Sequence, residues 1–250
     1  GGFGGTNDIG RVSLGVGRVS GLSNSYTTAN VWGGTNAENS AQFSGKSYGI
    51  ISVNSTLYMW VMVEGSYFSK SELYYSTNYG ATWTSAGWRF ENIGGAFSVP
   101  AFLNFGKDNF NARDNYVYIY APGVKSASFD SANTIDLARV LNDQIKNRVS
   151  YEFFAGMDAV DNSLWTTDIN SRKPVITYPS KVHWTISAGY NPGLNRYFLF
   201  NNSTPNPPQS ANSPGNLEIF DAPTPWGPWT LAASYNNFGG LGYTFSYYLA

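Results

Sequence analysis

The sequence predicts an all-β fold, a five-bladed β-propeller with incomplete first and last blades. The main observation is a pattern that occurs twice, at residues 72–83 (ELYYSTNYGATW) and 217–229 (LEIFDAPTPWGPW). Each copy is an apolar run, a polar turn, a glycine and a tryptophan that opens the next strand. Glycine permits the backbone angles that such a turn requires. Units that close in this way indicate four-stranded blades around a central funnel.

The composition fits one large all-β domain, here residues 1–250. The chain is 17% aromatic and only 12% charged, with a net charge of −1, so rings must cover much of the interior and of the funnel. Scattered Lys and Arg argue against a nucleic-acid partner. No apolar run reaches the length of a membrane span. The absence of cysteine excludes disulfides and thiolate metal sites.

The clearest blade covers residues 45–89. Its four predicted strands fall at residues 46–52, 57–63, 71–75 and 82–88. The run at 57–63 (LYMWVMV) is rich in β-branched and aromatic residues and predicts a strand buried on both faces. A tight turn at residues 53–55 joins the first two strands.

The remaining blades are less regular. The second begins near Phe97, with strands at residues 98–105, 115–120, 135–140 and 151–154 and a short helix within 141–148. The third has strands at residues 182–187, 196–200 and 217–220, with a long loop at 201–214. A sandwich of similar strands is the alternative.

Both ends of the chain predict partial blades. Residues 11–19 predict the third strand of a preceding blade, and residues 241–249 the inner strand of a following one. Counting both gives five. Because the chain opens on GGFGG and stops within an aromatic strand pattern, we expect a piece of a longer protein.

Two resemblances support this fold. Residues 76–83 (STNYGATW) resemble the Asp-box turn of sialidases, with Asn78 in the Asp place. A longer resemblance is to a bacterial family of five-bladed propellers that includes endo-D-arabinanases. It is carried by residues 105–108 (FGKD), 114–118 (DNYVY), 137–140 (LARV), 151–156 (YEFFAG), 165–166 (WT), 195–197 (NRY) and 221–229 (DAPTPWGPW). This resemblance implies the propeller fold and glycan hydrolysis. It also implies a Gly-Asp-Gly segment before Gly1, with an Asp that could be catalytic, and a strand pair after Leu249.

Ligands of propellers gather where the inner strands begin and where the loops between second and third strands project. Glycoside hydrolysis usually needs two carboxyl groups flanking the bond. Glu64 is the first candidate, because it ends the buried 57–63 strand and partial burial would raise its pKa; a solvated loop Glu is the alternative. Asp8, in the N-terminal loop, is the second, with a turn-forming role as the alternative. Asp130 also projects from such a loop, and we expect it to be solvated.

Sugar binding at the same face is assigned to aromatic and polar residues. These are Lys46, Tyr48, Tyr67, His183 and Trp184. Aromatic rings pack on the C–H faces of sugars, while polar groups bind hydroxyls. Each could instead be an ordinary packing or surface residue. His183 is the only histidine, which removes His-cluster metal sites and triads. We expect no cofactor and no catalytic metal, and leave a structural cation open.

Other acids are expected to be structural. Asp108 and Asp114 follow first strands, so they should form turns on the opposite face. Asp221 should cap the blade-closing turn, and Glu152 should pair with Arg148 or Arg139.

The sequence favours a secreted or cell-surface glycoside hydrolase of arabinan-like or related furanoside- or uronate-containing polysaccharides. Abundant Asn, Ser, Thr, Gly and Tyr with few charges is typical of secreted bacterial carbohydrate-active proteins. The alternative is a glycan-binding module without catalysis, favoured by the scarcity of carboxylates at the funnel. A protein-interaction propeller has no positive feature in this sequence.

Overall fold

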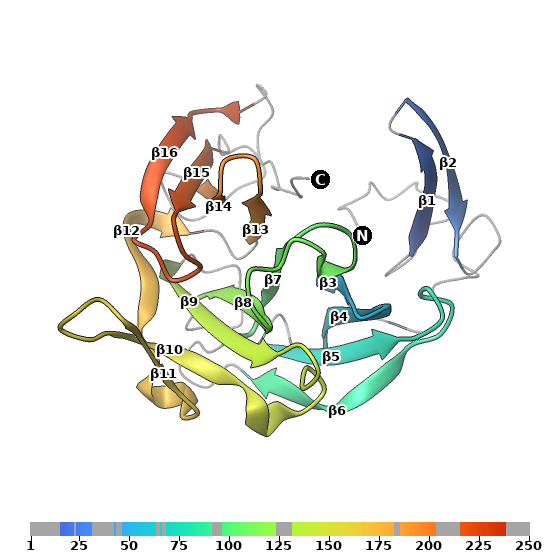
Figure 1. Ribbon diagram of the computed structural model, residues 1–250, viewed down its shortest axis with the longest axis horizontal. Coiled ribbons are helices and arrows are strands. Elements are labelled where there is room, and N and C mark those ends of the chain that lie inside the picture. The colour runs from blue at the N-terminus through green and yellow to red at the C-terminus, as the bar shows by residue number, and fades with distance from the viewer. Residues whose placement is uncertain are drawn as a thin grey trace.

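The computed structural model describes residues 16–22, 24–31, 43, 47–63, 66, 69–91, 97–123, 132–182, 186–203 and 216–238. They form sixteen strands and three short 3-10 helices. The sheets stand around a common centre rather than in two stacked layers (Figure 1). This arrangement supports the propeller prediction over a sandwich. No helix in these ranges is long and apolar enough to cross a bilayer.

One blade matches its prediction closely. Its antiparallel strands are β3 (Ser47–Val53), β4 (Thr56–Met62), β5 (Lys70–Ser76) and β6 (Thr84–Glu91), hydrogen-bonded in that order. Asn54 and Ser55, with φ of 51° and 61°, form the two-residue turn between β3 and β4. Such a turn matches the right-handed twist of the strands that it joins.

The next blade contains more strands than the sequence predicted. It holds β7 (Ala101–Asn104), β8 (Tyr116–Pro122), β9 (Ala132–Leu141), β10 (Glu152–Met157) and β11 (Ser163–Thr166). A further strand, β12 (Pro174–Val182), pairs with β9. The 3-10 helices are η2 (Lys107–Asn109), η3 (Arg148–Ser150) and η4 (Ile169–Ser171). The short helix predicted within 141–148 was placed too early. A 3-10 helix, η3, does precede Tyr151, but it begins only at Arg148, and residues 142–147 form turns and irregular backbone.

The third blade comprises β13 (Ile186–Asn191), β14 (Arg196–Ser203), β15 (Asn216–Ala222) and β16 (Thr230–Tyr235). The predicted inner strand at 182–187 was placed too early, because Val182 pairs with Ala132 and ends β12 instead. β13 pairs in parallel with β7 through Ala188 with Leu103 and Gly189 with Asn104. This pairing joins the last two blades into one ten-stranded sheet.

The N-terminal part forms a hairpin of β1 (Gly17–Leu22) and β2 (Ser25–Asn30). Residues 17–19 of the strand predicted at 11–19 lie in β1, which starts at Gly17, and residues 11–15 lie outside the described ones. The strand predicted at 241–249 lies outside the described residues, so the count of five blades stays a prediction.

The core lies in the seams between blades. Side chains alternate across a strand, so β8 and β9 serve two seams. Val117, Ile119, Ala138 and Val140 face the β3–β6 blade. Tyr118, Tyr120 and Leu137 face the β13–β16 blade. Burial on both faces explains the continuous apolar run of these strands.

Candidate functional site

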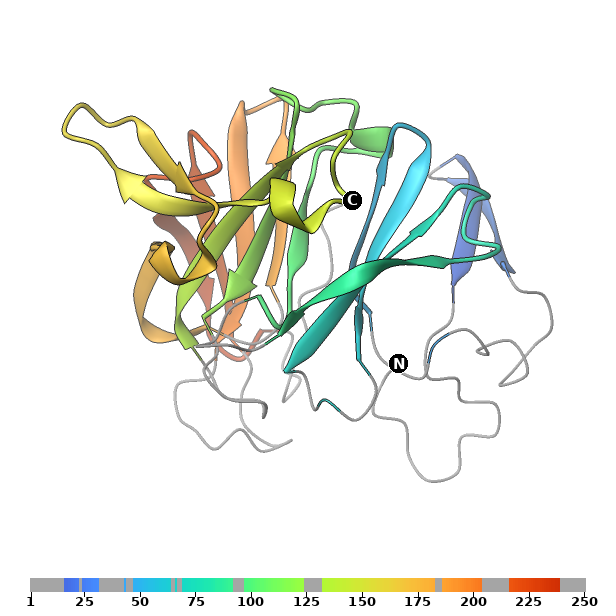
Figure 2. The same ribbon diagram turned by 90° about the horizontal axis from the view of Figure 1, so that it is seen from below.

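The three inner strands run in the same direction and begin at one face of the molecule. β7 and β13 are parallel. Asp108, just after β7, accepts a hydrogen bond from the Ser55 N–H, just after β3, so these two strands end side by side (Figure 2). We call the end where β3, β7 and β13 begin the mouth face. The links from β4 to β5, β8 to β9 and β14 to β15 connect strands at this same face.

Of the predicted site residues, Tyr48 lies among the described ones. Glu64, Asp8, Lys46, Tyr67, His183, Trp184 and Asp130 lie outside them, so their roles stay predictions. Val63, which precedes Glu64, donates its N–H to the Lys70 carbonyl at 3.1 Å and accepts from the Ser66 N–H at 3.1 Å.

Tyr48 occupies a β-bulge at the start of β3. The register with β4 shifts between Ser47, opposite Val61, and Gly49, opposite Trp60. Tyr48 is the extra residue, and bulges commonly re-aim a side chain. Its ring is half-buried and packs against the core between the β3–β6 and β7–β12 blades. Burial raises the pKa of the Tyr48 phenol far above its ordinary value, so the hydroxyl stays neutral. The position at the mouth agrees with the prediction; contact with a ligand is untested.

A buried carboxylate that sequence reasoning missed lies near the mouth end of the third blade. Glu218 of β15 is only 4% exposed. Its Oε1 accepts from the Tyr178 hydroxyl at 3.0 Å, and its Oε2 accepts from the Asn201 amide at 3.0 Å. Asn201 lies opposite Ile186, the first residue of β13. Glu218 shares its face of β15 with Phe220, which is an inward position. A charged residue in an inward position was the signal that could have revealed it.

A second buried carboxylate, Asp136 of β9, is paired. Arg172 donates from Nε to its Oδ2 at 2.7 Å and from Nη1 to the Ile169 carbonyl at 2.8 Å. Burial raises the pKa of Asp136, and the hydrogen bond and charge of Arg172 oppose that effect. Both side chains are nearly covered, with exposed fractions of 13% for Arg172 and 6% for Asp136. This pair joins the loop before β12 to the blade.

The acids expected on the opposite face do form turns and blade contacts. Asp114 accepts from the Tyr116 N–H at 2.8 Å and from the Tyr118 hydroxyl at 2.7 Å. Asp221 binds Arg196 at 2.6 Å and Thr230 Oγ1 at 2.7 Å. The hydrogen bond from Thr230 is the main reason that the pKa of Asp221 lies below its ordinary value, and the hydrogen bond and charge of Arg196 act in the same direction. The turn-forming role predicted for Asp114 is confirmed. Asp221 is also structural, but its described partners are the side chains of Arg196 and Thr230, where the sequence predicted a cap on backbone N–H groups.

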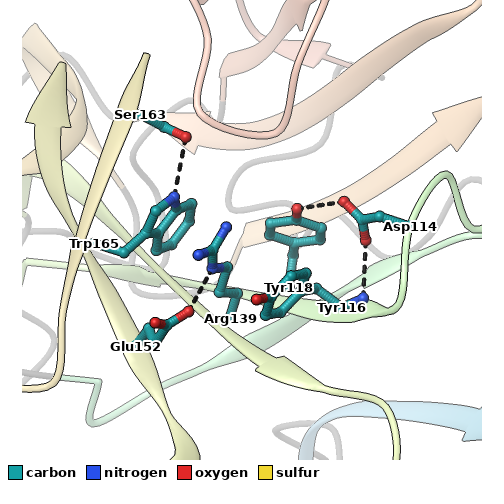
Figure 3. A network of polar contacts seen from close by, with 7 residues as sticks. All are labelled: Asp114, Tyr116, Tyr118, Arg139, Glu152, Ser163 and Trp165. Atoms are coloured by element: carbon teal, nitrogen blue, oxygen red, sulfur yellow. Dashed lines mark hydrogen bonds and ion pairs between the residues drawn. The ribbon is translucent and has the colours of Figure 1, made fainter. Parts of the chain in front are cut away.

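Glu152 pairs with Arg139, one of its two predicted partners, at 2.8 Å. The Arg139 guanidinium lies between two rings, 4.1 Å from the centroid of Tyr116 and 4.0 Å from that of Trp165 (Figure 3). The Trp165 Nε1–H donates to Ser163 Oγ at 3.0 Å. This network connects strands β8, β9, β10 and β11 at the end of the blade opposite the mouth.

The described side chains near the mouth are already engaged or neutral. Glu218 and Asp136 are each occupied by hydrogen bonds, and Tyr48 is a neutral phenol. Within the ranges that the structure describes, no group of three or more His, Cys, Asp or Glu could hold a metal ion.

Comparison with known proteins gives a family and several distant structural likenesses. Residues 26–247 match the family model of a domain of unknown function, DUF4185. No curated protein matches the chain. An endo-1,5-α-L-arabinanase from Thermotoga petrophila RKU-1 has a TM-score of 0.45 and 11% identity, covering 72% of this chain and 37% of that one.

Two further solved structures show the same low level of likeness. The GH93 α-L-arabinofuranosidase of Fusarium graminearum, solved with arabinobiose, has a TM-score of 0.36 and 13% identity over 84% of this chain and 55% of that one. The GH43_1 enzyme from Xanthomonas citri, solved with xylotriose, has a TM-score of 0.30 and 11% identity over 76% and 73%. The chain thus spans well under half of the arabinanase. Because the family model matches most of the sequence, the chain belongs to the DUF4185 family.

Proposed function

We propose that the chain is part of a secreted or cell-surface carbohydrate-active protein that binds polysaccharide at the mouth face. The proposed activity is glycoside hydrolysis of an arabinan-like or related polysaccharide. Glu64 would act as the proton donor and Asp8 as the second carboxyl group, since hydrolysis needs one protonated and one ionised or nucleophilic acid. Lys46, Tyr48, Tyr67, His183 and Trp184 would bind the sugar rings. The reaction as proposed uses no cofactor and no catalytic metal.

The observation that carries the proposal is the common direction of β3, β7 and β13. These strands start together, so the residues at their starts and in the links between second and third strands belong to one face. Tyr48 marks that face on β3. The sequence resemblance to a propeller family that includes endo-D-arabinanases supports the substrate class, and its most specific segment, residues 221–229, forms the turn that closes the third blade.

A non-catalytic glycan-binding module is the second candidate, and one observation favours it. The two buried carboxylates near the mouth in the described residues, Glu218 and Asp136, are both held by hydrogen bonds from neighbouring side chains. The hydrolase proposal therefore rests on Glu64 and Asp8.

The direct test incubates the full-length protein with a panel of arabinans and uronate-containing polysaccharides and looks for released oligosaccharides. The hydrolase proposal predicts products that disappear in Glu64→Gln with binding retained. A folded protein that binds a polysaccharide, releases nothing and is unaffected by Glu64→Gln and Asp8→Asn would be a binding module. A folded protein that neither binds nor cleaves any member of the panel contradicts both.

A further inference from the structure

The loop after β9 places two cations over aromatic rings in the seam between the β3–β6 and β7–β12 blades. The Nζ of Lys146 lies 4.7 Å from the centroid of the Tyr75 ring. The guanidinium carbon of Arg148 lies 4.9 Å from the centroid of Phe90, 5.3 Å from that of Phe153 and 5.9 Å from that of Trp88. These distances are within the range of cation–π attraction.

The loop is fixed in this position by a hydrogen bond between blades. The Nε1–H of Trp88, on β6, donates to the carbonyl oxygen of Lys146 at 2.8 Å. Trp88 also packs edge-on against Tyr151, with ring centroids 5.0 Å apart. The loop that carries both cations is therefore held against the Trp88 indole, at the end of the molecule opposite the mouth.

Neither cation has an acidic partner in the part of the chain that the structure describes. The ion pairs found there engage Lys70, Arg89, Arg139, Arg172 and Arg196. Glu152, the nearest acid in sequence to Arg148, is directed to Arg139 instead. Asp143, in the same loop, forms no ion pair with either cation. The positive charge of this seam is left uncompensated by the described side chains.

The environment of Arg148 is unfavourable for an unpaired charge. Its side chain is half-buried, and burial lowers the pKa of its guanidinium, with the phenol of Tyr151 as the opposing influence. Among the described residues, its guanidinium contacts aromatic rings, which accept no strong hydrogen bond. A half-buried guanidinium without an acceptor carries a desolvation cost that a bound anion would offset. Its planar set of N–H donors suits a carboxylate, which it can bind in bidentate fashion.

We propose that Lys146, Arg148 and Trp88 form a binding site for the carboxylate of an acidic sugar, on the face opposite the mouth. Arg148 would hold the carboxylate, Lys146 would add charge, and the half-exposed ring of Trp88 would pack on the C–H face of the sugar. The identification of the anion as a sugar rests on the proposed function. The preference of the site for an anion rests on the contacts described above. The site would hold a uronate-bearing chain at a second point, away from the mouth.

The test is a titration of the full chain with trigalacturonate, in which binding is measured by calorimetry and by the fluorescence of Trp88 and its neighbours. The fully methyl-esterified trisaccharide and inorganic sulfate serve as comparison probes. We expect trigalacturonate to bind and the neutral ester to bind at least about ten-fold more weakly, because a hydrogen bond to a charged group contributes that much. Binding should also weaken as salt rises, since exposed charges are screened.

Four variants locate the site. Arg148→Gln should weaken the binding of trigalacturonate at least about ten-fold, and Lys146→Gln should weaken it less. Arg148→Lys should have an effect between those of these two variants, because lysine keeps the charge but lacks the planar set of N–H donors. Arg113→Gln is the matched control, because Arg113 also lies over a tyrosine ring, 5.7 Å from Tyr190, but in another seam. It should leave binding unchanged. Thermal melts of each variant show whether the fold is retained.

Equal binding of the ester and the acid, or equal binding by wild type and a folded Arg148→Gln variant, would overturn the proposal. Binding of sulfate without trigalacturonate would overturn the assignment of the ligand as a sugar acid. A protein that binds trigalacturonate through Arg148 yet cleaves no polysaccharide would keep this site while removing the hydrolase proposal.

Discussion

The carboxylate of Asp108 accepts a hydrogen bond from the backbone N–H of Ser55, 2.8 Å away and 53 residues earlier in the chain. The Ser52 hydroxyl donates to the same oxygen at 2.7 Å. Asp108 follows β7 and Ser55 lies in the turn after β3, so one side chain connects two blades. This contact also establishes which strand ends share a face, and hence where the mouth lies.

Asp108→Ala should therefore loosen the contact between these blades. Because the carboxylate is exposed, we expect a loss of about 1 kcal/mol in the free energy of unfolding. The hydrogen bonds from Ser52 and Ser55 lower the pKa of Asp108. An acid with a lowered folded-state pKa contributes stability above its unfolded pKa, near 3.8, and loses it as pH falls through the folded value. In urea unfolding, the difference in the free energy of unfolding between Asp108→Ala and wild type should be smaller at pH 3 than at pH 7. Asp143→Ala, an exposed acid in a loop, should show no such difference at either pH; an equal loss would contradict the blade-connecting role.

A second connection between blades is buried, so its loss should cost more. The Tyr120 hydroxyl, on β8, donates to the carbonyl of Pro225 in the closing turn of the third blade at 2.7 Å. Tyr120→Phe leaves that carbonyl without this donor, which costs about 1–3 kcal/mol. A thermal melt should show a Tm lower by several degrees, by the usual scaling of about 2–4 °C per kcal/mol for a domain of this size. Tyr235→Phe, at a side chain 51% exposed, should melt like wild type. An unchanged Tm for Tyr120→Phe would show that the turn is not anchored by this bond.

Removing the partner of a buried acid should have the largest effect. Arg172→Met leaves the Asp136 carboxylate without its cation, and breaking such a pair typically costs about 3–5 kcal/mol. Burial already raises the pKa of Asp136, and loss of Arg172 should raise it further. A raised folded-state pKa means that the folded form binds the proton more tightly, so the loss should be greatest at neutral pH and smaller as pH falls toward the unfolded value. Denaturant unfolding from pH 8 to pH 4 measures this loss in the free energy of unfolding. Lys173→Met, a substitution at an exposed neighbour, serves as the control. A loss in Arg172→Met that grows as the pH falls would contradict this explanation.

Asn78 stabilises the turn between β5 and β6 through its side-chain amide. Its Oδ1 accepts from the Thr82 N–H at 3.0 Å and from Ser76 Oγ at 2.9 Å, and its Nδ2 donates to Thr82 Oγ1 at 2.9 Å. Asn78→Asp keeps the acceptor, and the Thr82 hydroxyl can donate to it, so stability should change by less than about 0.5 kcal/mol. Asn78→Ala removes the acceptor and should cost about 1 kcal/mol. Equal losses in both variants would mean that the turn does not depend on this oxygen.

Local pattern predicted the strands that pair with near neighbours. The strands of the β3–β6 blade were found because apolar runs and a two-residue turn at Asn54 and Ser55 specify a hairpin without help from distant residues. β12 was missed because Pro174 and Pro179 interrupt the strand pattern, and its partner, β9, lies more than 30 residues earlier. Proline is tolerated in such a strand at an edge or a bulge.

The candidate site was less predictable than the fold. Asp108 was correctly placed on the opposite face, but its bonds to Ser52 and Ser55 cross blades and leave no trace in sequence spacing. Tyr48 was predicted from its place at a strand start, while the bulge that positions it depends on register with β4. Glu218 was detectable as a charge in an inward position, yet its partners, Tyr178 and Asn201, come from two other strands. Contacts of this kind are set by packing between blades.

Hydrogen exchange of the full chain with and without a neutral arabinan tests the central claim, that polysaccharide binds at the mouth face. We predict slower exchange on binding in the links at residues 63–70, 123–131 and 204–215 and at the start of β3, with the turns after β3 and β13 unchanged. Slower exchange confined to those opposite-face turns at saturating arabinan would contradict the account.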